Sequence, residues 1–386
     1  MQVSDGQWRD FSPKLVHGIV RRHMMPRMGI YWADFLVSLA VGVGAFVAVG
    51  LLGPVTVGGM VAFVASVLAL YRAAVFIHEI VHFRSRRQFS RFRLVWNILC
   101  GIPLFIPVFM YECHAEHHSR RWYGTVQDAE YLPLARMRPR DIVGVLAAVP
   151  LLPLFGPLRF GILTPVSWLV PALRAYVYTN LSTLKLDVEY RGRPPDGPAE
   201  RRSWMVQEAG CLLVFATVAC AALSSWIPWP LILQWYLTYL GIASLNTLRL
   251  LGAHRYLADE DGSSIVEQML DTYNYPRRRW LGECWAPVGL RLHALHHLLP
   301  GLPYHAYQRA HRDLITQLPA GSPYFLTASP GLWTSIATLW RNATASAAGR
   351  PAEVPFEFPS PPGAQRDDEP INEVAPAPSR RSSGQG

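Results

Sequence analysis

Four long apolar segments constrain the fold of this chain more than any other feature of its sequence. They cover residues 35–52, 55–77, 209–227 and 231–251. A helix needs about 20 mostly apolar residues to cross the roughly 30 Å hydrocarbon core of a bilayer. Hydrophobic residues make up 51% of the sequence, which favours membrane spans over a set of soluble domains. We therefore predict an all-α membrane protein with four transmembrane helices.

The short links between these segments predict two helical hairpins. Gly53-Pro54 separates the first two segments, and Pro228-Trp229-Pro230 separates the last two. Tryptophan is common at a membrane–water interface, so the second link fits a turn at the bilayer surface. Two further apolar stretches, 94–110 and 142–170, contain prolines and have basic or polar residues at both ends. We expect both to be interfacial or re-entrant, and an extra helical hairpin is the alternative for the second.

Arginine clusters at the ends of the spans predict which side of the membrane each end faces. They precede the first span (Arg21, Arg22, Arg27), follow the second (Arg84, Arg86, Arg87, Arg91, Arg93), precede the third (Arg191, Arg193, Arg201, Arg202) and follow the fourth (Arg277, Arg278, Arg279). Cytoplasmic loops carry an excess of Lys and Arg, so we expect these ends in the cytoplasm. The net charge of +9 is spread over such runs, which argues against a nucleic-acid-binding domain.

The same features predict three parts of the chain. Residues 1–30 form a cytosolic N-terminal segment, and 31–345 form the membrane domain. Residues 346–386 are rich in Pro, Ser, Gly and charge, and we expect a disordered, cytoplasmic tail there.

Nine of the thirteen histidines lie at the predicted cytoplasmic ends of the spans. "HEIVH" at 78–82, "HAEHH" at 114–118 and "HALHH" at 293–297 form three boxes, and one more histidine follows the fourth span. The nine are His78, His82, His114, His117, His118, His254, His293, His296 and His297. Positions i, i+3 and i+4 share one face of a helix, so each H-x-x-H-H run directs three imidazoles the same way. We predict that they converge in a cytosolic, histidine-rich di-metal domain.

Nine imidazoles are too many for one zinc ion. Zinc takes four ligands in structural sites, and three ligands plus water in catalytic ones. Two metal ions of higher coordination number would use all nine donors and leave positions open for oxygen chemistry. Imidazole binds several metals, and the spacing alone does not choose between them. The H-E-x-x-H pattern around Glu79 is also that of zinc metalloproteases, so a membrane zinc protease is a competing hypothesis.

The order of the boxes resembles the integral-membrane fatty acid desaturase family, whose wider relatives include membrane hydroxylases, ketolases and alkane monooxygenases. "HAEHHSRRWYGTVQDAEYLP" is similar to the second box of the family, and "HALHHLLPGLPYH" is similar to its third. The resemblance covers roughly residues 33–313. It implies that the eight box histidines bind two irons, and that His254 is the additional ligand some members supply from the last membrane helix. Some members also have an asparagine one turn earlier, where this chain has Leu250.

The resemblance implies an O2-dependent enzyme that introduces a double bond into a fatty acyl chain. The alternative is a lipid, sterol or terpenoid hydroxylase or ketolase, because the same oxidant can remove a second hydrogen or transfer oxygen. A membrane zinc protease would need a third ligand, usually an Asp in an L-D-G motif, and Leu186-Asp187-Val188 is only a partial match. A metal carrier would place polar ligands within the spans, whereas these histidines lie at one end.

Candidate orienting carboxylates and the need for an electron donor complete the predictions. The carboxylates Glu79, Glu112, Glu116, Asp128 and Asp259 are candidates to orient the metal ligands or nearby loops. The sequence has no cytochrome b5 haem motif, no G-x-G-x-x-G loop and no iron–sulfur cysteine set. We therefore expect an external electron donor, such as a ferredoxin or a cytochrome b5-type protein with its reductase.

Overall fold

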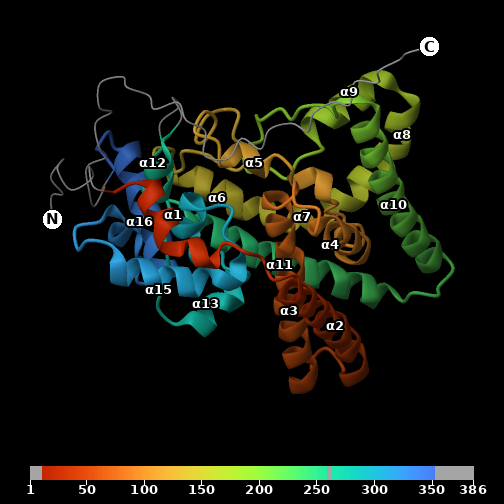
Figure 1. Cartoon of the computed structure of the whole chain (residues 1–386). Coiled ribbons are helices and arrows are strands. Elements are labelled where there is room, and N and C mark those ends of the chain that lie inside the picture. The colour runs from red at the N-terminus through yellow and green to blue at the C-terminus, as the bar shows by residue number, and fades with distance from the viewer. Residues whose placement is uncertain (1–10, 259–262, 353–386) are drawn as a thin grey trace, which may run out of the picture.

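A computed structural model describes residues 11–258 and 263–352 of the chain (Figure 1). These residues form helices joined by turns and loops, with isolated β-bridges and no strand among them. The prediction of an all-α chain is confirmed for this part of the protein. The predicted tail at 346–386 begins inside the last described helix, which ends at Ala347, and from residue 353 onward it lies outside the described residues.

The α-helices of the described residues are α1 (Pro13–Val20), α2 (Met28–Leu52), α3 (Val57–His82), α4 (Phe89–Trp96), α5 (His114–His117), α6 (Pro139–Ala148), α7 (Leu152–Gly156), α8 (Thr164–Leu169), α9 (Pro171–Asn180), α10 (Gly197–Leu223), α11 (Trp229–Ala253), α12 (Ile265–Leu270), α13 (Arg279–Trp285), α14 (His293–Leu298), α15 (Tyr307–Gln317) and α16 (Leu332–Ala347). Short 3₁₀ or π turns are η2 (Arg21–His23), η3 (Asn97–Gly101), η4 (Val108–Tyr111), η5 (Val149–Leu151), η6 (Pro157–Leu163), η7 (Tyr304–Ala306) and η8 (Pro323–Thr327).

Helices α2 and α3 pack along each other and project from the rest of the molecule (Figure 1). Gly53 adopts a positive φ of 85° at the end of α2, and the Thr56 hydroxyl then caps α3 by accepting from the Gly59 N–H at 3.0 Å. The helices approach closely at Gly42, where an added Cβ would lie 2.7 Å from the Leu70 side chain. The sequence therefore favours a tight antiparallel pair.

The connection between α10 and α11 is different from the tight hairpin that we predicted. The main contacts of α10 are with η6 and α8, whereas those of α11 are with α3, α7 and α16. Figure 1 shows α11 leaving the turn at the lower end of α10 and running back across the middle of the molecule. The two helices are joined in sequence, but each is held by other elements.

Four helical segments of the described chain are long and apolar enough to cross a membrane. They are Met28–Leu52, Val57–His82, Pro139–Leu169 and Gly197–Leu223. Three of them match predicted spans, but the predicted span 231–251 is not among them. Its helix, α11, contains Gln234, Asn246 and a buried arginine, Arg249, which lower its hydropathy. This helix packs against protein over much of its length, so it does not need an apolar surface throughout.

The segment Pro139–Leu169 is long and apolar enough to cross a membrane, whereas we predicted that residues 142–170 are interfacial or re-entrant. The four prolines at 150, 153, 157 and 165 do not end the helical run. Each lies at the first or second position of a new helical turn, where the missing N–H costs little. The helix changes between α, 3₁₀ and π geometry at the prolines, and the helical run stays continuous.

A buried charge cluster fixes this proline-rich run against α10. Arg159 of η6 and Glu208 of α10 lie 2.7 Å apart, with side chains that are both 0% exposed. Arg174 of α9 pairs with the other oxygen of Glu208 at 2.6 Å. The Arg159 guanidinium also donates to Thr164, Ser182 and the carbonyl of Leu181. Because a buried charge is tolerated only when it is paired and hydrogen-bonded, these contacts hold the two segments in one arrangement.

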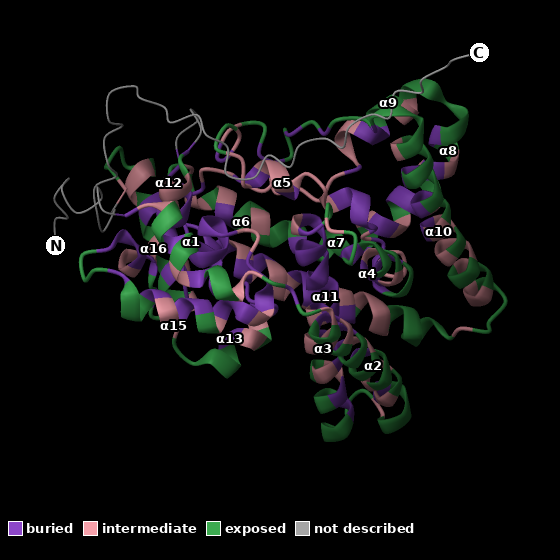
Figure 2. Ribbon diagram, in the orientation of Figure 1, coloured by how far each residue is buried: buried purple, intermediate pink, exposed green. Residues whose placement is uncertain are grey.

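The surface of the long helices fits contact with lipid. Figure 2 shows exposed residues along the projecting ends of α2 and α3 and along α10. Many of them are large and apolar, including Val41 and Leu51 on α2 and Leu213 and Leu223 on α10. Trp226 and Trp229 are exposed at the turn between α10 and α11. Such an apolar exterior supports association with a membrane.

Ion pairs connect the α2–α3 pair to the C-terminal part of the chain. Arg72 of α3 lies 2.6 Å from Asp34 of α2 and 3.1 Å from Glu283 of α13. Tyr304, which follows the third histidine box, donates to Asp34 at 2.8 Å. These contacts bring the end of α3 and the region of α14 together.

Candidate metal centre

The structure brings all nine predicted histidines together in two groups. One group contains His78, His82, His114, His118 and His296, and the other contains His117, His254, His293 and His297. Within each group, one ring nitrogen from every residue lies within 4.8 Å of the others. The last turn of α3, the short helix α5, the end of α11 and α14 supply these residues. Residues as far apart in the sequence as His78 and His297 thus meet at one place.

The five-histidine group is centred on His118. Its Nε2 lies 3.1 Å from His114 Nε2 and 2.9 Å from His296 Nε2. Both ring nitrogens of His78 and Nε2 of His82 are buried and have no hydrogen-bond partner among the described residues. Buried polar atoms are normally hydrogen-bonded, so these nitrogens point to a ligand that the polypeptide does not supply.

The four-histidine group has similar spacing and lies directly beside the first. His293 Nε2 is 3.0 Å from His254 Nε2 and 3.2 Å from His297 Nε2. The rings of His118 and His297, which belong to different groups, have their centroids 4.3 Å apart. The two groups therefore form one continuous centre.

The donor set fits two metal ions. Nitrogen atoms that bind one ion at about 2.0–2.1 Å lie roughly 3 Å from one another, as these Nε2 atoms do. Burial and the neighbouring imidazoles hold the pKa of His118, His293, His296 and His297 well below the usual range. These rings are neutral near pH 7, which is the form that binds a metal.

Carboxylates orient two of the imidazoles in the second box. His114 Nδ1 donates to Glu130 at 2.7 Å, and His117 Nδ1 donates to Asp128 at 2.9 Å. A hydrogen bond at Nδ1 fixes the tautomer in which the lone pair of Nε2 is free for a metal. Burial acts to raise the pKa of Glu130, but its contacts with His114 and Tyr111 lower that pKa to about 2. Glu130 therefore remains an ionised acceptor.

Tyrosines support histidines from the other segments. The Tyr123 hydroxyl donates to Asp271 at 2.7 Å and lies 3.0 Å from His254 Nδ1, so it accepts from that ring. The Tyr307 hydroxyl lies 2.8 Å from His296 Nδ1. As in the second box, these contacts leave Nε2 directed into the centre.

Not all of the carboxylates that we predicted to orient the metal site contact a histidine. Asp128 contacts a histidine of the centre, whereas Glu112 pairs with Arg93 and Glu116 accepts from Tyr190. Asp259 lies outside the described residues. Glu130 and Asp271 were missed by sequence reasoning. Glu130 lies only two positions after Asp128, which is a signal that could have found it, but no motif marks Asp271.

Glu79 is engaged away from the imidazoles. Its carboxylate accepts from the Tyr31 hydroxyl and, at 3.1 Å, from the backbone N–H of Tyr304. It therefore ties the end of α3 to the loop after α14, and it is not presented as a general base beside a zinc ion. His78 and His82 meet three other histidines, and Asp187 is not part of either group. This arrangement argues against the zinc protease hypothesis.

Comparisons with known proteins show which family the chain belongs to. Residues 57–328 match the model of the family described as fatty acid desaturase. A ceramide hydroxylase from Caulobacter vibrioides (strain NA1000 / CB15N) is 40% identical over 334 residues, which cover 85% of this chain and 94% of that protein. No solved structure matches the chain. The family match spans both outer histidine boxes, and the relative aligns over nearly its whole length. The chain therefore belongs to the fatty acid desaturase family and is a membrane oxidoreductase of that superfamily.

Proposed function

We propose that this chain is an O2-dependent di-iron hydroxylase that acts on a ceramide or a closely similar N-acylated long-chain lipid. The observation that carries this proposal is the 40% identity to a ceramide hydroxylase over 94% of that protein's length. It favours hydroxylation, which was our alternative, over desaturation, which was our main interpretation of the sequence. The paired histidine groups support a metal-dependent oxidation in either case.

The nine imidazoles are the residues that would hold two irons, five in one group and four in the other. When bound, a pair of irons supplies the oxidising power that O2 needs to attack an unactivated C–H bond. The polypeptide keeps the imidazoles neutral, and Asp128, Glu130 and Asp271 fix the direction of the rings directly or through Tyr123. Most of the ligands are almost fully buried, so the chain excludes bulk water from the centre.

The reaction requires a partner that supplies electrons. Hydroxylation places one oxygen atom of O2 in the C–H bond and reduces the other to water, which consumes two electrons and two protons. The absence of haem, nucleotide and iron–sulfur motifs from the sequence supports an external donor. We propose a ferredoxin or a cytochrome b5-type protein with its reductase in this role.

The same proposal places the centre at the cytoplasmic surface of a membrane. His78 and His82 lie in the last turn of α3, a candidate span, and the arginine-rich stretch 84–93 follows directly. The charge rule assigns such a stretch to the cytoplasm. A lipid substrate can then reach the histidines from the bilayer along the apolar helices.

A lipid analysis tests the proposed reaction. We expect cells that make ceramides and express this chain to accumulate ceramides heavier by one oxygen atom, as measured by mass spectrometry. Fragmentation assigns the new hydroxyl to the acyl chain or to the long-chain base. Ceramides or fatty acids that lose two hydrogens instead would make the chain a desaturase. If the lipid profile is unchanged although the protein is present in the membrane and an electron-donor system is supplied, then the chain is neither a hydroxylase nor a desaturase of these lipids.

A further inference from the structure

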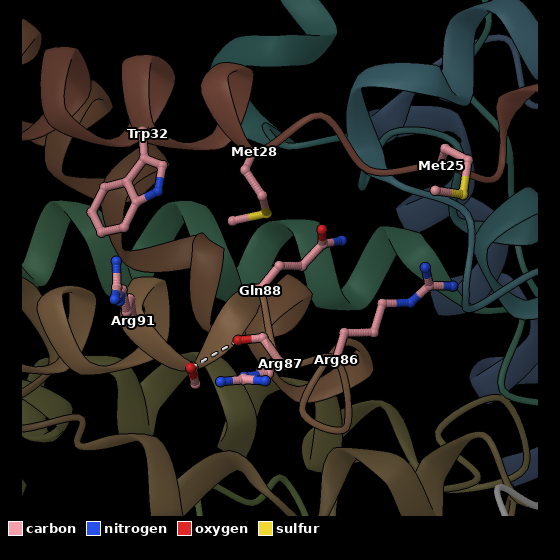
Figure 3. A pocket seen from close by; sticks show the side chains of 8 residues that line it. Met25, Met28, Trp32, Arg86, Arg87, Gln88 and Arg91 are labelled. Atoms are coloured by element: carbon pink, nitrogen blue, oxygen red, sulfur yellow. Dashed lines mark hydrogen bonds between the residues drawn. The ribbon is translucent and has the colours of Figure 1, made fainter.

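A groove of about 1140 Å³ lies beside the start of α2 and is lined by residues that the proposed reaction does not use (Figure 3). Met25, Met28 and Trp32 form one wall, and Arg86, Arg87 and Arg91 lie across from them. The volume slightly exceeds the roughly 300–1,000 Å³ of typical small-molecule pockets, so the groove can admit part of a large ligand.

The arginines of this groove have no counter-charge within the part of the chain that the structure describes. Among the described residues, none of the three guanidinium groups takes part in an ion pair or a hydrogen bond, and no acidic residue lines the groove. The Arg86 guanidinium lies 5.4 Å from the Phe83 ring, which is an aromatic and not an acidic partner. By contrast, the neighbouring Arg93 is neutralised by Glu112 at 2.5 Å. The groove thus concentrates unpaired positive charge, and such a site attracts an anion.

The opposite wall is apolar. Trp32 packs edge-on against Phe92, with ring centroids 5.1 Å apart, so the wall is supported from behind. Met25 leaves 71% of its surface exposed. An apolar wall of this kind would gain little from a small soluble anion or from the polar rim of an acidic protein. It favours a ligand that has both a negative charge and an apolar part.

The groove also lies where a membrane surface is expected. Its apolar wall includes the start of α2, and its arginines lie between the end of α3 and the first turns of α4. Both α2 and α3 are candidate spans, and these are their adjacent ends. Arginines next to the ends of membrane helices can reach lipid headgroups.

We propose that this groove binds the headgroup of an anionic phospholipid. Arg87 and Arg91 bind the phosphate, because the guanidinium group matches phosphate oxygens in pairs. Arg86, which points toward Met25, adds positive charge at the other end of the groove. Met28 and Trp32 contact the glycerol and the upper part of the acyl chains. This site is separate from the histidine centre and does not depend on which reaction that centre performs.

Binding to lipid of defined composition tests the proposal. The purified full chain in a zwitterionic detergent is titrated with fluorescent phosphatidylglycerol, and the anisotropy is recorded. Arg87→Gln with Arg91→Gln is expected to bind about 30-fold more weakly, because each arginine at an anionic surface contributes roughly a factor of five. The matched control is Arg201→Gln with Arg202→Gln, which removes the same charge from two exposed arginines at the start of α10. The control is expected to bind within twofold of the unchanged chain.

Competing probes identify the ligand class. Inorganic phosphate at millimolar concentration and phosphatidylcholine should not displace the fluorescent lipid, whereas unlabelled phosphatidylglycerol should. Equal losses in the two double variants would mean that general charge, and not the groove, attracts the lipid. Displacement by phosphate alone would make the site a simple anion site. Displacement by an acidic ferredoxin, with no preference for phosphatidylglycerol over phosphatidylcholine, would assign the groove to a protein partner. Each of these results would overturn the proposal.

Discussion

Replacement of His118 or of His297 with alanine is expected to reduce product formation to the background of the host. His118 belongs to the five-histidine group, and its Nε2 contacts two other ligands of that group. His297 belongs to the four-histidine group and lies beside His293. Each substitution therefore removes a donor from a different one of the two proposed metal positions. Loss of a residue that only orients a ligand typically costs about 10–100-fold, so loss of a ligand itself should exceed about 100-fold. Hydroxylated lipid in expressing cells measures the effect.

The matched control for this prediction is His17→Ala. His17 is exposed on α1 and belongs to neither group, so this variant should keep full activity. Protein level and elution from a sizing column show whether each variant is folded. The metal content gives a readout that does not depend on turnover, and each ligand variant should retain less iron than the control. Full turnover by either ligand variant would remove that histidine, and with it the proposed role of its box, from the metal site.

Replacement of Glu208 with alanine is expected to destabilise the protein by about 3–5 kcal/mol, the usual cost of leaving a buried partner charge unpaired. Glu208 is the carboxylate partner of both Arg159, whose side chain is 0% exposed, and Arg174. Its removal leaves the Arg159 charge buried between η6 and α10. The change in the free energy of unfolding is measured in detergent micelles, where the protein is unfolded by heat or by SDS and circular dichroism monitors the loss of helix.

The same helix offers a control for this prediction. Glu200 of α10 pairs with Arg193 at 3.4 Å, but the Arg193 side chain is 56% exposed. An exposed ion pair contributes about 0–1 kcal/mol, and Glu200 also accepts from the backbone N–H of Asp196, which is worth about 1 kcal/mol, so Glu200→Ala should cost clearly less than Glu208→Ala. A combined Arg159→Met and Glu208→Met variant removes both buried charges and should recover much of the loss. If the Glu208→Ala and Glu200→Ala variants unfold at the same temperature or SDS concentration, then the buried cluster does not hold the two segments together.

The histidine centre could be predicted from the sequence because its signal is local. The three boxes place histidines at spacings of three and four residues, and all three fall on the predicted cytoplasmic side. Among the residues that orient them, Asp128 was predicted and Glu130 lies close to it in sequence, but Asp271 carries no such signal. Asp271 acts on His254 through Tyr123, which lies 148 positions away. Such a contact depends on the packing of distant segments, so local patterns do not reveal it.

The membrane helices were predicted less completely for a related reason. Prolines inside residues 142–170 suggested an interrupted segment, but each occupies an early position of a helical turn and is tolerated there. The apolar run at 231–251 suggested a lipid-facing span, yet Arg249 is buried within the protein. Hydropathy reports how apolar a helix is, but it does not report whether lipid or protein surrounds it.

Metal analysis of the purified protein tests the central claim most directly. The claim is that the two adjacent histidine groups, with five and four imidazoles, each bind an iron ion. Protein purified from iron-supplemented cells should contain about two irons per chain and little zinc, as measured by inductively coupled plasma mass spectrometry. The His17→Ala variant should match it. A single tightly bound zinc per chain with no iron, in protein that is folded and retains all nine histidines, would contradict the account.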